Sequence, residues 1–274
     1  MAGFLNALGF LTIIRIPARF GYRQDFSPSL TYFPLIGLIL GIIISLAFWA
    51  FSLFLPILVA VITVVALEAV LTGGLHYDGL ADVFDGIFSG RSKSEEILSI
   101  MKKSDIGTFG VMAVVLALAF KISLIYYLYQ NYSENIFSFL VVLSFFSCFG
   151  RWSMVYLLTS YKPVKKEGSL AAMFQSASNR MRFLVSTIYT VILFFILVYV
   201  SEASYGRQEL FLNPGLALIP GLKAMVAFLA SLLALIIASH LFYRRLGGIN
   251  GDVAGAVSQV TEITFLLFSL ILVA

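Results

Sequence analysis

The sequence predicts an all-α polytopic membrane protein, a bundle of about six or seven transmembrane helices. Of the 274 residues, 60% are hydrophobic and only 12% are charged, and the mean hydropathy is +0.99. A soluble domain carries about 25% charged residues. Apolar runs recur along the chain, most of them close to the ~20 residues that one helical crossing needs. We therefore predict a single integral membrane domain over residues 1–274.

The first apolar run, residues 3–16, is too short to cross a membrane. Arg15-Ile16-Pro17 ends it after about 14 residues, below the ~20 that a crossing needs. No basic segment precedes it, as one would in a signal peptide. We expect a retained interfacial or re-entrant helix within a cytoplasmic or interfacial segment, residues 1–31.

Seven later apolar runs are predicted to cross the membrane. They cover residues 32–54, 57–72, 111–130, 137–160, 182–201 and 223–243 and a last run that reaches Ala274. The last run is the weakest because Glu262 lies inside it. Six crossings with a re-entrant C-terminus therefore remain an alternative. The single cysteine, Cys148, excludes an internal disulfide and a cysteine-based metal site.

The basic residues predict the orientation of the bundle. Segments 1–31, 73–110, 161–181 and 244–255 alternate to one side and hold nearly all of the Lys and Arg. Cytoplasmic loops of membrane proteins carry such an excess. We therefore predict a multi-pass protein of the cell (plasma) membrane, with loops 73–110 and 244–255 forming an active site that faces the cytoplasm. The net charge of +4 is no argument for nucleic acid as a partner.

Segment 73–110 begins with the most chemically distinctive residues of the chain. Asp78, Asp82 and Asp85 are spaced four and then three apart, so a helix would place their carboxylates on one face. A hard divalent cation such as Mg²⁺ commonly stabilises carboxylates that lie so close together. We favour metal binding over a solvated acidic helix face. Gly73 and Gly74 allow a tight turn or the close approach of backbone to a ligand.

Four other polar residues are candidates for the same site. Asn250 and Asp252 lie in a Gly/Ala-rich loop and form a plausible second half of an oxygen-ligand site. Glu68, just inside the preceding span, is a functional candidate unless it simply reaches water. His76 suits either a general base or a structural role in the turn.

Lys121 and Arg151 lie within predicted spans and need partners there. We expect Lys121 to face the bundle interior and to pair with an acid or bind an anion. Arg151 is nearer the cytoplasmic end of its span and suits bidentate contact with a phosphate. A further cluster of basic residues is better explained as a positive-inside loop than as a substrate-binding site. Its members are Lys162, Lys165, Lys166, Arg180 and Arg182. Metal-binding carboxylates beside basic residues indicate phosphoryl-transfer chemistry.

At Leu71–Gly86 the chain has the sequence LTGGLHYDGLADVFDG, which closely resembles the signature of the cobalamin synthase family, the adenosylcobinamide-GDP ribazoletransferases. Three further stretches are similar to family motifs and follow in the family's order. They are Ile100–Lys102 with Ile106–Gly110, Arg151-Trp152, and Gly247–Ala256. One difference lies in the second motif, where Lys103 and Asp105 stand at positions that the family fills with Asp and Arg.

The resemblance implies a membrane transferase that acts late in adenosylcobalamin synthesis. The hydroxyl of α-ribazole, or of its 5′-phosphate, would attack adenosylcobinamide-GDP, and GMP would leave. Mg²⁺ would be held by Asp78, Asp82, Asp85 and Asp252, with Glu68 as a further candidate ligand. Asp82, Asp78 and His76 would be catalytic. The substrate would contact Gly73, Gly74, Lys102, Asp105, Arg151 and Asn250. Membrane lipid, a second copy of the chain and other enzymes of the pathway are expected partners.

Two other functions are weaker alternatives. A CDP-alcohol phosphotransferase also carries spaced aspartates at a membrane face, but its pattern requires Arg where Asp82 follows Ala81. A secondary transporter would use Glu68, Lys121 and Arg151 as coupling charges in broken helices related by a repeat. The sequence has no such repeat.

Overall fold

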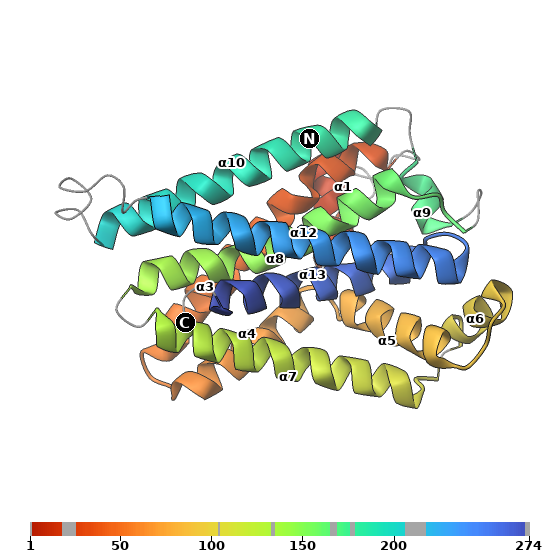
Figure 1. The fold of residues 1–274 in the computed structure, drawn as a ribbon, viewed down its shortest axis with the longest axis horizontal. Coiled ribbons are helices and arrows are strands. Elements are labelled where there is room, and N and C mark those ends of the chain that lie inside the picture. Colours follow the sequence, from red (N-terminus) through yellow and green to blue (C-terminus); the bar gives the residue numbers. More distant parts are fainter. Residues whose placement is uncertain are drawn as a thin grey trace.

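The computed structural model confirms the helical architecture (Figure 1). It describes residues 2–17, 26–103, 105–132, 135–164, 169–175, 179–205 and 218–271. Within these ranges every regular element is a helix, apart from one isolated β-bridge between Pro163 and Ile249. Parts of the predicted segments lie outside the described residues: 18–25 of the N-terminal segment, Lys165 and Lys166, and 272–274 of the last run.

Six of the described helices are long and apolar enough to cross a membrane, so the protein is a multi-pass membrane protein. They are α3 (Phe33–Ser52) with the short helix η1 (Ser27–Tyr32) before it, α7 (Thr108–Asn131), α8 (Ile136–Ser160), α10 (Asn179–Tyr205), α12 (Leu218–Leu246) and α13 (Gly251–Ile271). The last of them is unbroken and buries Glu262 completely. The final apolar run is therefore a helix of full spanning length.

The second predicted span differs from the expectation. Helix α4 (Ile57–Leu71) has only 15 residues, and α5 (Leu75–Phe88) leaves it at an angle of 86°. Gly73 and Gly74 make the bend at φ values of +62° and +70°, a backbone region that favours glycine. By length and composition, the bent pair can serve as a seventh span.

The segment predicted as a polar loop, 73–110, is largely helical. It contains α5, then α6 (Ser94–Met101), then the start of α7. The other predicted active-site loop is also shorter than expected, because only residues 247–250 separate α12 from α13. The predicted site residues are thus carried mainly by helices.

Helix α8 forms the centre of the bundle and packs against α3, α10 and α13. Glycines allow its close approach to α3, since a Cβ added at Gly37 would lie 2.5 Å from the Ser147 carbonyl oxygen. The N-terminal run forms α1 (Ala2–Leu11), shorter than predicted and too short to span. A short helix, α9 (Leu170–Met173), lies between α8 and α10.

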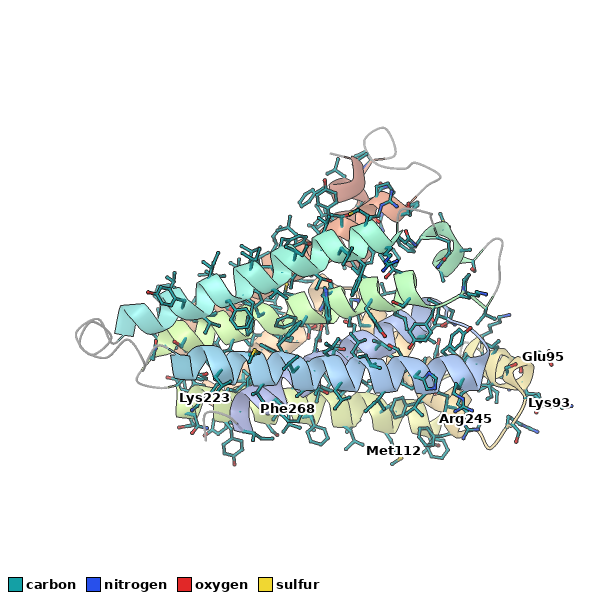
Figure 2. All side chains as sticks on the ribbon, turned by 45° about the horizontal axis from the view of Figure 1, so that its top comes forward. Lys93, Glu95, Met112, Lys223, Arg245 and Phe268 are labelled. Carbon is teal, nitrogen blue, oxygen red and sulfur yellow. The ribbon has the colours of Figure 1, made fainter. Side chains whose placement is uncertain are left out.

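The two ends of the bundle differ in what they carry (Figure 2). Lys93, Glu95 and Arg245 lie at one end, and Lys223 lies at the other. We call these the Arg245 end and the Lys223 end. Helix α6 and the turn between α12 and α13 are at the Arg245 end (Figure 1).

Candidate active site

The three predicted aspartates lie on one helix, α5, which packs against α13 and α7. The helix buries His76, Tyr77, Leu80 and Val83 in the bundle, among others. On its other side Asp78 is exposed, and Asp82 and Asp85 are half-buried. The amphipathic pattern therefore presents a row of carboxylates at the surface of α5, as the spacing predicts.

Asp252 comes to the same place from the far end of the chain. It lies in the first turn of α13, which crosses α5 closely at Gly79. A Cβ added at Gly79 would lie 2.6 Å from the Asp252 carbonyl oxygen, so only glycine permits this approach. The carboxylate of Asp82 is repelled by those of Asp252, Asp78 and Asp85. We call these four carboxylates the acidic face.

Asn250 orients Asp252 through side-chain hydrogen bonds. Its Nδ2 atom donates to Oδ2 of Asp252 at 2.7 Å, and its Oδ1 atom accepts from the backbone N–H of Val253 at 2.9 Å. Asn250 thereby caps the first turn of α13. The structure places this predicted substrate contact beside the acidic face and gives it a structural task as well.

The β-bridge fixes the turn that carries Asn250. Val164 donates its N–H to the Ile249 carbonyl at 2.9 Å, and Ile249 donates to the Lys162 carbonyl at 3.0 Å. A Cβ added at Gly248 would lie 2.6 Å from the Val164 nitrogen. Main-chain contacts to the α8–α9 connection therefore hold the α12–α13 turn in place.

Asp85 caps the start of helix α7, which follows α6 in the chain. Its two carboxylate oxygens accept backbone hydrogen bonds from Gly107 and Gly110, each at 2.7 Å. These bonds close the segment between α5 and α7, which we call the excursion. It contains α6, Lys102 and Asp105. The side chains of Lys102 and Asp105 are exposed on it. Asp85 thus has only its remaining lone pairs available for another ligand.

The acidic face fits Mg²⁺ in the form in which proteins usually bind it. Mg²⁺ prefers oxygen ligands and is commonly held by one or two carboxylates, several waters and the phosphates of a substrate. Asp78, Asp82 and Asp252 form no ion pair among the described residues. Among the residues that the structure describes, no three His, Cys, Asp or Glu side chains are placed to hold a metal ion by themselves. The donors therefore suit a cation that phosphate oxygens complete.

Glu68 lies in a different group of charges, in the interior of the bundle. Lys121 Nζ contacts Glu68 Oε2 at 2.8 Å and Glu262 Oε2 at 2.5 Å. Arg151 pairs with Glu262 and lies 3.7 Å from Glu68. All four side chains are at most 1% exposed. We call them the buried charge cluster, and it confirms the prediction that Lys121 faces inward and pairs with an acid.

The cluster gives Glu68 and Arg151 partners other than those expected. Glu68 faces two cations, and Arg151 is fully buried against two carboxylates. A metal ligand at Glu68, or a phosphate contact at Arg151, would require these ion pairs to open. Glu262 was missed as a site residue. Its signal was an acid in an apolar run, in a chain where Lys121 needed such a partner.

His76 lies on α5 two residues before Asp78, contacts the cluster, and is 1% exposed. Its Nδ1 atom is 3.5 Å from Nη2 of Arg151. A guanidinium has only donors, so Nδ1 is the acceptor in this contact. The proton of a neutral His76 ring therefore resides on Nε2.

Comparison with known proteins identifies the family. The sequence matches the family model for cobalamin-5-phosphate synthase over residues 3–270. The chain belongs to this family. It is 34% identical to the adenosylcobinamide-GDP ribazoletransferase of Geotalea daltonii over 96% of this chain and 95% of that one. The enzymes of the same name from Chlorobaculum tepidum and Clostridioides difficile are 33% and 29% identical, over 96% and 100% of this chain and 92% and 98% of theirs. No solved structure matches.

Membership of the cobalamin-5-phosphate synthase family makes the protein a transferase of cobalamin biosynthesis. The four stretches that resemble family motifs meet in the structure. Leu71–Gly86 forms the bend and α5, and the backbone N–H groups of Gly107 and Gly110, in the stretch Ile106–Gly110, donate to Asp85. Arg151 belongs to the buried charge cluster, and Gly247–Ala256 brings Asp252 to α5. Segments far apart in sequence thus form one continuous region.

Proposed function

We propose that the protein transfers the cobinamide-phosphate moiety of adenosylcobinamide-GDP to α-ribazole or its 5′-phosphate, and releases GMP in a Mg²⁺-dependent reaction. The name that its relatives share, adenosylcobinamide-GDP ribazoletransferase, supports these substrates. The observation that carries the chemistry is the acidic face, where the carboxylates of Asp78, Asp82 and Asp252 repel one another and form no ion pair in the described chain. Unpaired carboxylates suit a reaction between phosphate groups and a divalent cation.

The proposed step exchanges one phosphorus–oxygen bond for another. The α-ribazole hydroxyl attacks the phosphorus on the cobinamide side of the diphosphate. The bond from that phosphorus to the bridging oxygen breaks, and GMP leaves with that oxygen. The hydroxyl proton passes to a carboxylate of the acidic face. We assign it there because His76 is buried and its Nδ1 atom faces Arg151.

The chain's own residues divide the remaining tasks. Asp78, Asp82 and Asp252 would hold Mg²⁺, and Asp85 would contribute through its free lone pairs. The bound ion supplies charge neutralisation for the diphosphate and the leaving GMP. Lys102 is exposed on the excursion that Asp85 closes, and it would offset further phosphate charge. The Gly73–Gly74 turn would let substrate approach the backbone, because a Cβ added at Gly74 would meet nothing within 4 Å.

We also propose that the Arg245 end faces the cytoplasm of a plasma-membrane protein. The positive-inside rule supports this orientation, since Lys93 and Arg245 lie at that end (Figure 2). Single cysteines at positions 93 and 223, in a Cys148→Ala background, test it in intact cells. An impermeant thiol reagent should label only position 223; labelling of position 93 alone would reverse the orientation. Self-association and contacts with other pathway enzymes stay predictions.

A turnover assay on purified protein in liposomes tests the reaction. Adenosylcobinamide-GDP is supplied with α-ribazole or its phosphate, and GMP and the corrinoid product are followed with Mg²⁺ or with EDTA. We expect both products to form together and only with Mg²⁺. Folded protein that releases no GMP with either acceptor would overturn the proposed function, and equal rates in EDTA would overturn the metal requirement.

A further inference from the structure

We propose that the buried charge cluster positions the acidic face for the reaction. By this inference Glu68, Lys121, Arg151 and Glu262 are positioning residues that hold the first turn of α5. They thereby set where Asp78 and Asp82 stand opposite Asp252. The catalytic consequence rests on the proposed function, whereas the structural consequence can be measured without any substrate.

The cluster joins four helices at full burial. Glu68 is on α4, Lys121 on α7, Arg151 on α8 and Glu262 on α13, and each is at most 1% exposed. Charges inside a membrane protein are expensive and mark function by default. Well-packed apolar residues often stabilise a core as well as a buried ion pair does. A purely stabilising role is therefore a poor reason for four such groups, whereas fixing the relative positions of four helices is a sufficient one.

Two consecutive residues of α5 contact the cluster. Tyr77 donates its hydroxyl to Oε2 of Glu68 at 3.4 Å, and its ring centroid lies 5.0 Å from Nζ of Lys121. His76 contacts Arg151 at 3.5 Å. These residues form the first turn of α5, directly after the bend. The next residue in the chain is Asp78, so the cluster holds the helix one residue away from the acidic face.

The bend explains why α5 needs such support. Gly73 and Gly74 have no side chains with which to fix the direction of the helix that follows. The backbone of glycine also has more conformational freedom than that of any other residue type. A Cβ at Gly74 would meet nothing within 4 Å, so no neighbouring side chain packs against that residue to fix the direction of α5. The contacts of His76 and Tyr77 with the cluster add a restraint at this turn to the packing of α5 against α13 and α7. Because residues four apart share a helix face, holding this turn also orients Asp78 and Asp82.

Helix α13 connects the same cluster to the other half of the site. It carries Glu262 in the cluster and Asp252 at its first turn. The two residues are separated by about 15 Å along the helix, at ~1.5 Å per residue. Both helices that build the acidic face are therefore attached to one set of ion pairs.

A charge-balanced variant tests the structural part. Glu68→Gln with Lys121→Met removes one acid and one base, keeps Arg151 paired with Glu262, and leaves every aspartate of the acidic face in place. Hydrogen–deuterium exchange of detergent-solubilised protein, without substrate or metal, should show residues 75–88 exchanging at least about tenfold faster. The matched control is Ser45→Ala, which removes a buried contact to Ser144 at 3.0 Å between α3 and α8. It should leave exchange in α5 unchanged.

Turnover by the same variants tests the catalytic part. We expect kcat of the double variant to fall about a hundredfold, since a displacement of ~1 Å can cost that much. KM for adenosylcobinamide-GDP should change less than about threefold, as for a residue that does not bind substrate. Tyr77→Phe keeps all four charges and should fold normally, so it serves if the double variant does not. We expect Tyr77→Phe to show faster exchange of residues 75–88 and a lower kcat as well, both by a smaller factor than in the double variant.

The outcomes separate the inference from the proposed function. Unmodified protein that lacks ribazole transfer would overturn the function, while the exchange experiment would still decide the positioning role. Unchanged α5 exchange in the folded variants would overturn the inference. Faster exchange with unchanged kcat would overturn its catalytic part. An equal effect of Ser45→Ala on α5 would show general loosening of the bundle and would overturn it too.

Discussion

The acidic face and the buried charge cluster both contain carboxylates, but only the cluster balances their charge with cations. The acidic face has four carboxylates, from exposed to half-buried, and none is in an ion pair among the described residues. The cluster has two carboxylates and two cations, all fully buried and paired. A low-dielectric interior tolerates charge only when it is balanced. The uncompensated charge therefore lies where a cation and a phosphate substrate can reach it.

The largest expected effect comes from Asp82→Asn, which weakens the acidic face without altering its shape. Asp82 interacts with the charges of Asp78, Asp85 and Asp252, so its removal disturbs cation binding most directly. Turnover should fall at least about 10³-fold, at the upper end of losses for single electrostatic groups. The thermal unfolding midpoint should not fall, because one of several repelling charges is lost. A fully active variant would remove Asp82 from the metal site.

Sequence reasoning succeeded where the signal is local. The apolar runs predicted most of the spans, the spacing of Asp78, Asp82 and Asp85 predicted one helix face, and the depth of Lys121 predicted an inward side chain with an acid or an anion as its partner. It failed where the answer depended on distant contacts. That Glu262 is the second partner of Lys121 follows from the packing of α13 against α7.

The bend between α4 and α5 shows a second limit of the sequence. Gly73-Gly74 permits a turn, but the same pair also suits a loop, and only the packing of α5 against α13 and α7 selects a helix after it. The capping of α7 by Asp85 is equally non-local, because Gly107 and Gly110 lie more than twenty residues away in the chain. The acidic side chain of Asp85 marked it as a candidate site residue, whereas its role in capping α7 could not be predicted from the sequence.

Breaking the balance of the cluster should have the next largest effect, on stability. Lys121→Met leaves Glu68 and Glu262 with Arg151 alone, so a buried carboxylate loses its partner. We expect a loss of about 3–5 kcal/mol in the free energy of unfolding, measured by denaturation in detergent. Adding Glu262→Gln to Lys121→Met restores equal numbers of charges and should recover part of the loss. Additive losses in the double variant would show that charge balance is not what stabilises the cluster.

A smaller effect is expected at the turn that carries Asp252. Gly248→Ala places a Cβ 2.6 Å from the Val164 nitrogen, so the β-bridge must shift. Overpacking of this kind costs about 1–3 kcal/mol, and turnover should fall by about tenfold as Asp252 moves. Gly9→Ala in α1 is the control, since its nearest contact at 3.0 Å is the flexible side chain of Ile16. Equal losses in the two variants would mean that the bridge does not position Asp252.

The smallest effect is expected at the exchanged charges of the second motif. Lys103 and Asp105 are both exposed, and neither forms an ion pair within the described ranges. Isolated surface charges contribute little to stability, commonly within about 0.5 kcal/mol. Restoring the family's charges with Lys103→Asp and Asp105→Arg should therefore leave stability unchanged and alter turnover less than about threefold. A large gain in kcat would instead place one of these positions on the substrate phosphates, and the single variants would then show which one. Unlike the charges of the acidic face and the buried charge cluster, those of Lys103 and Asp105 are neither concentrated nor buried. Exchanging them therefore changes few interactions.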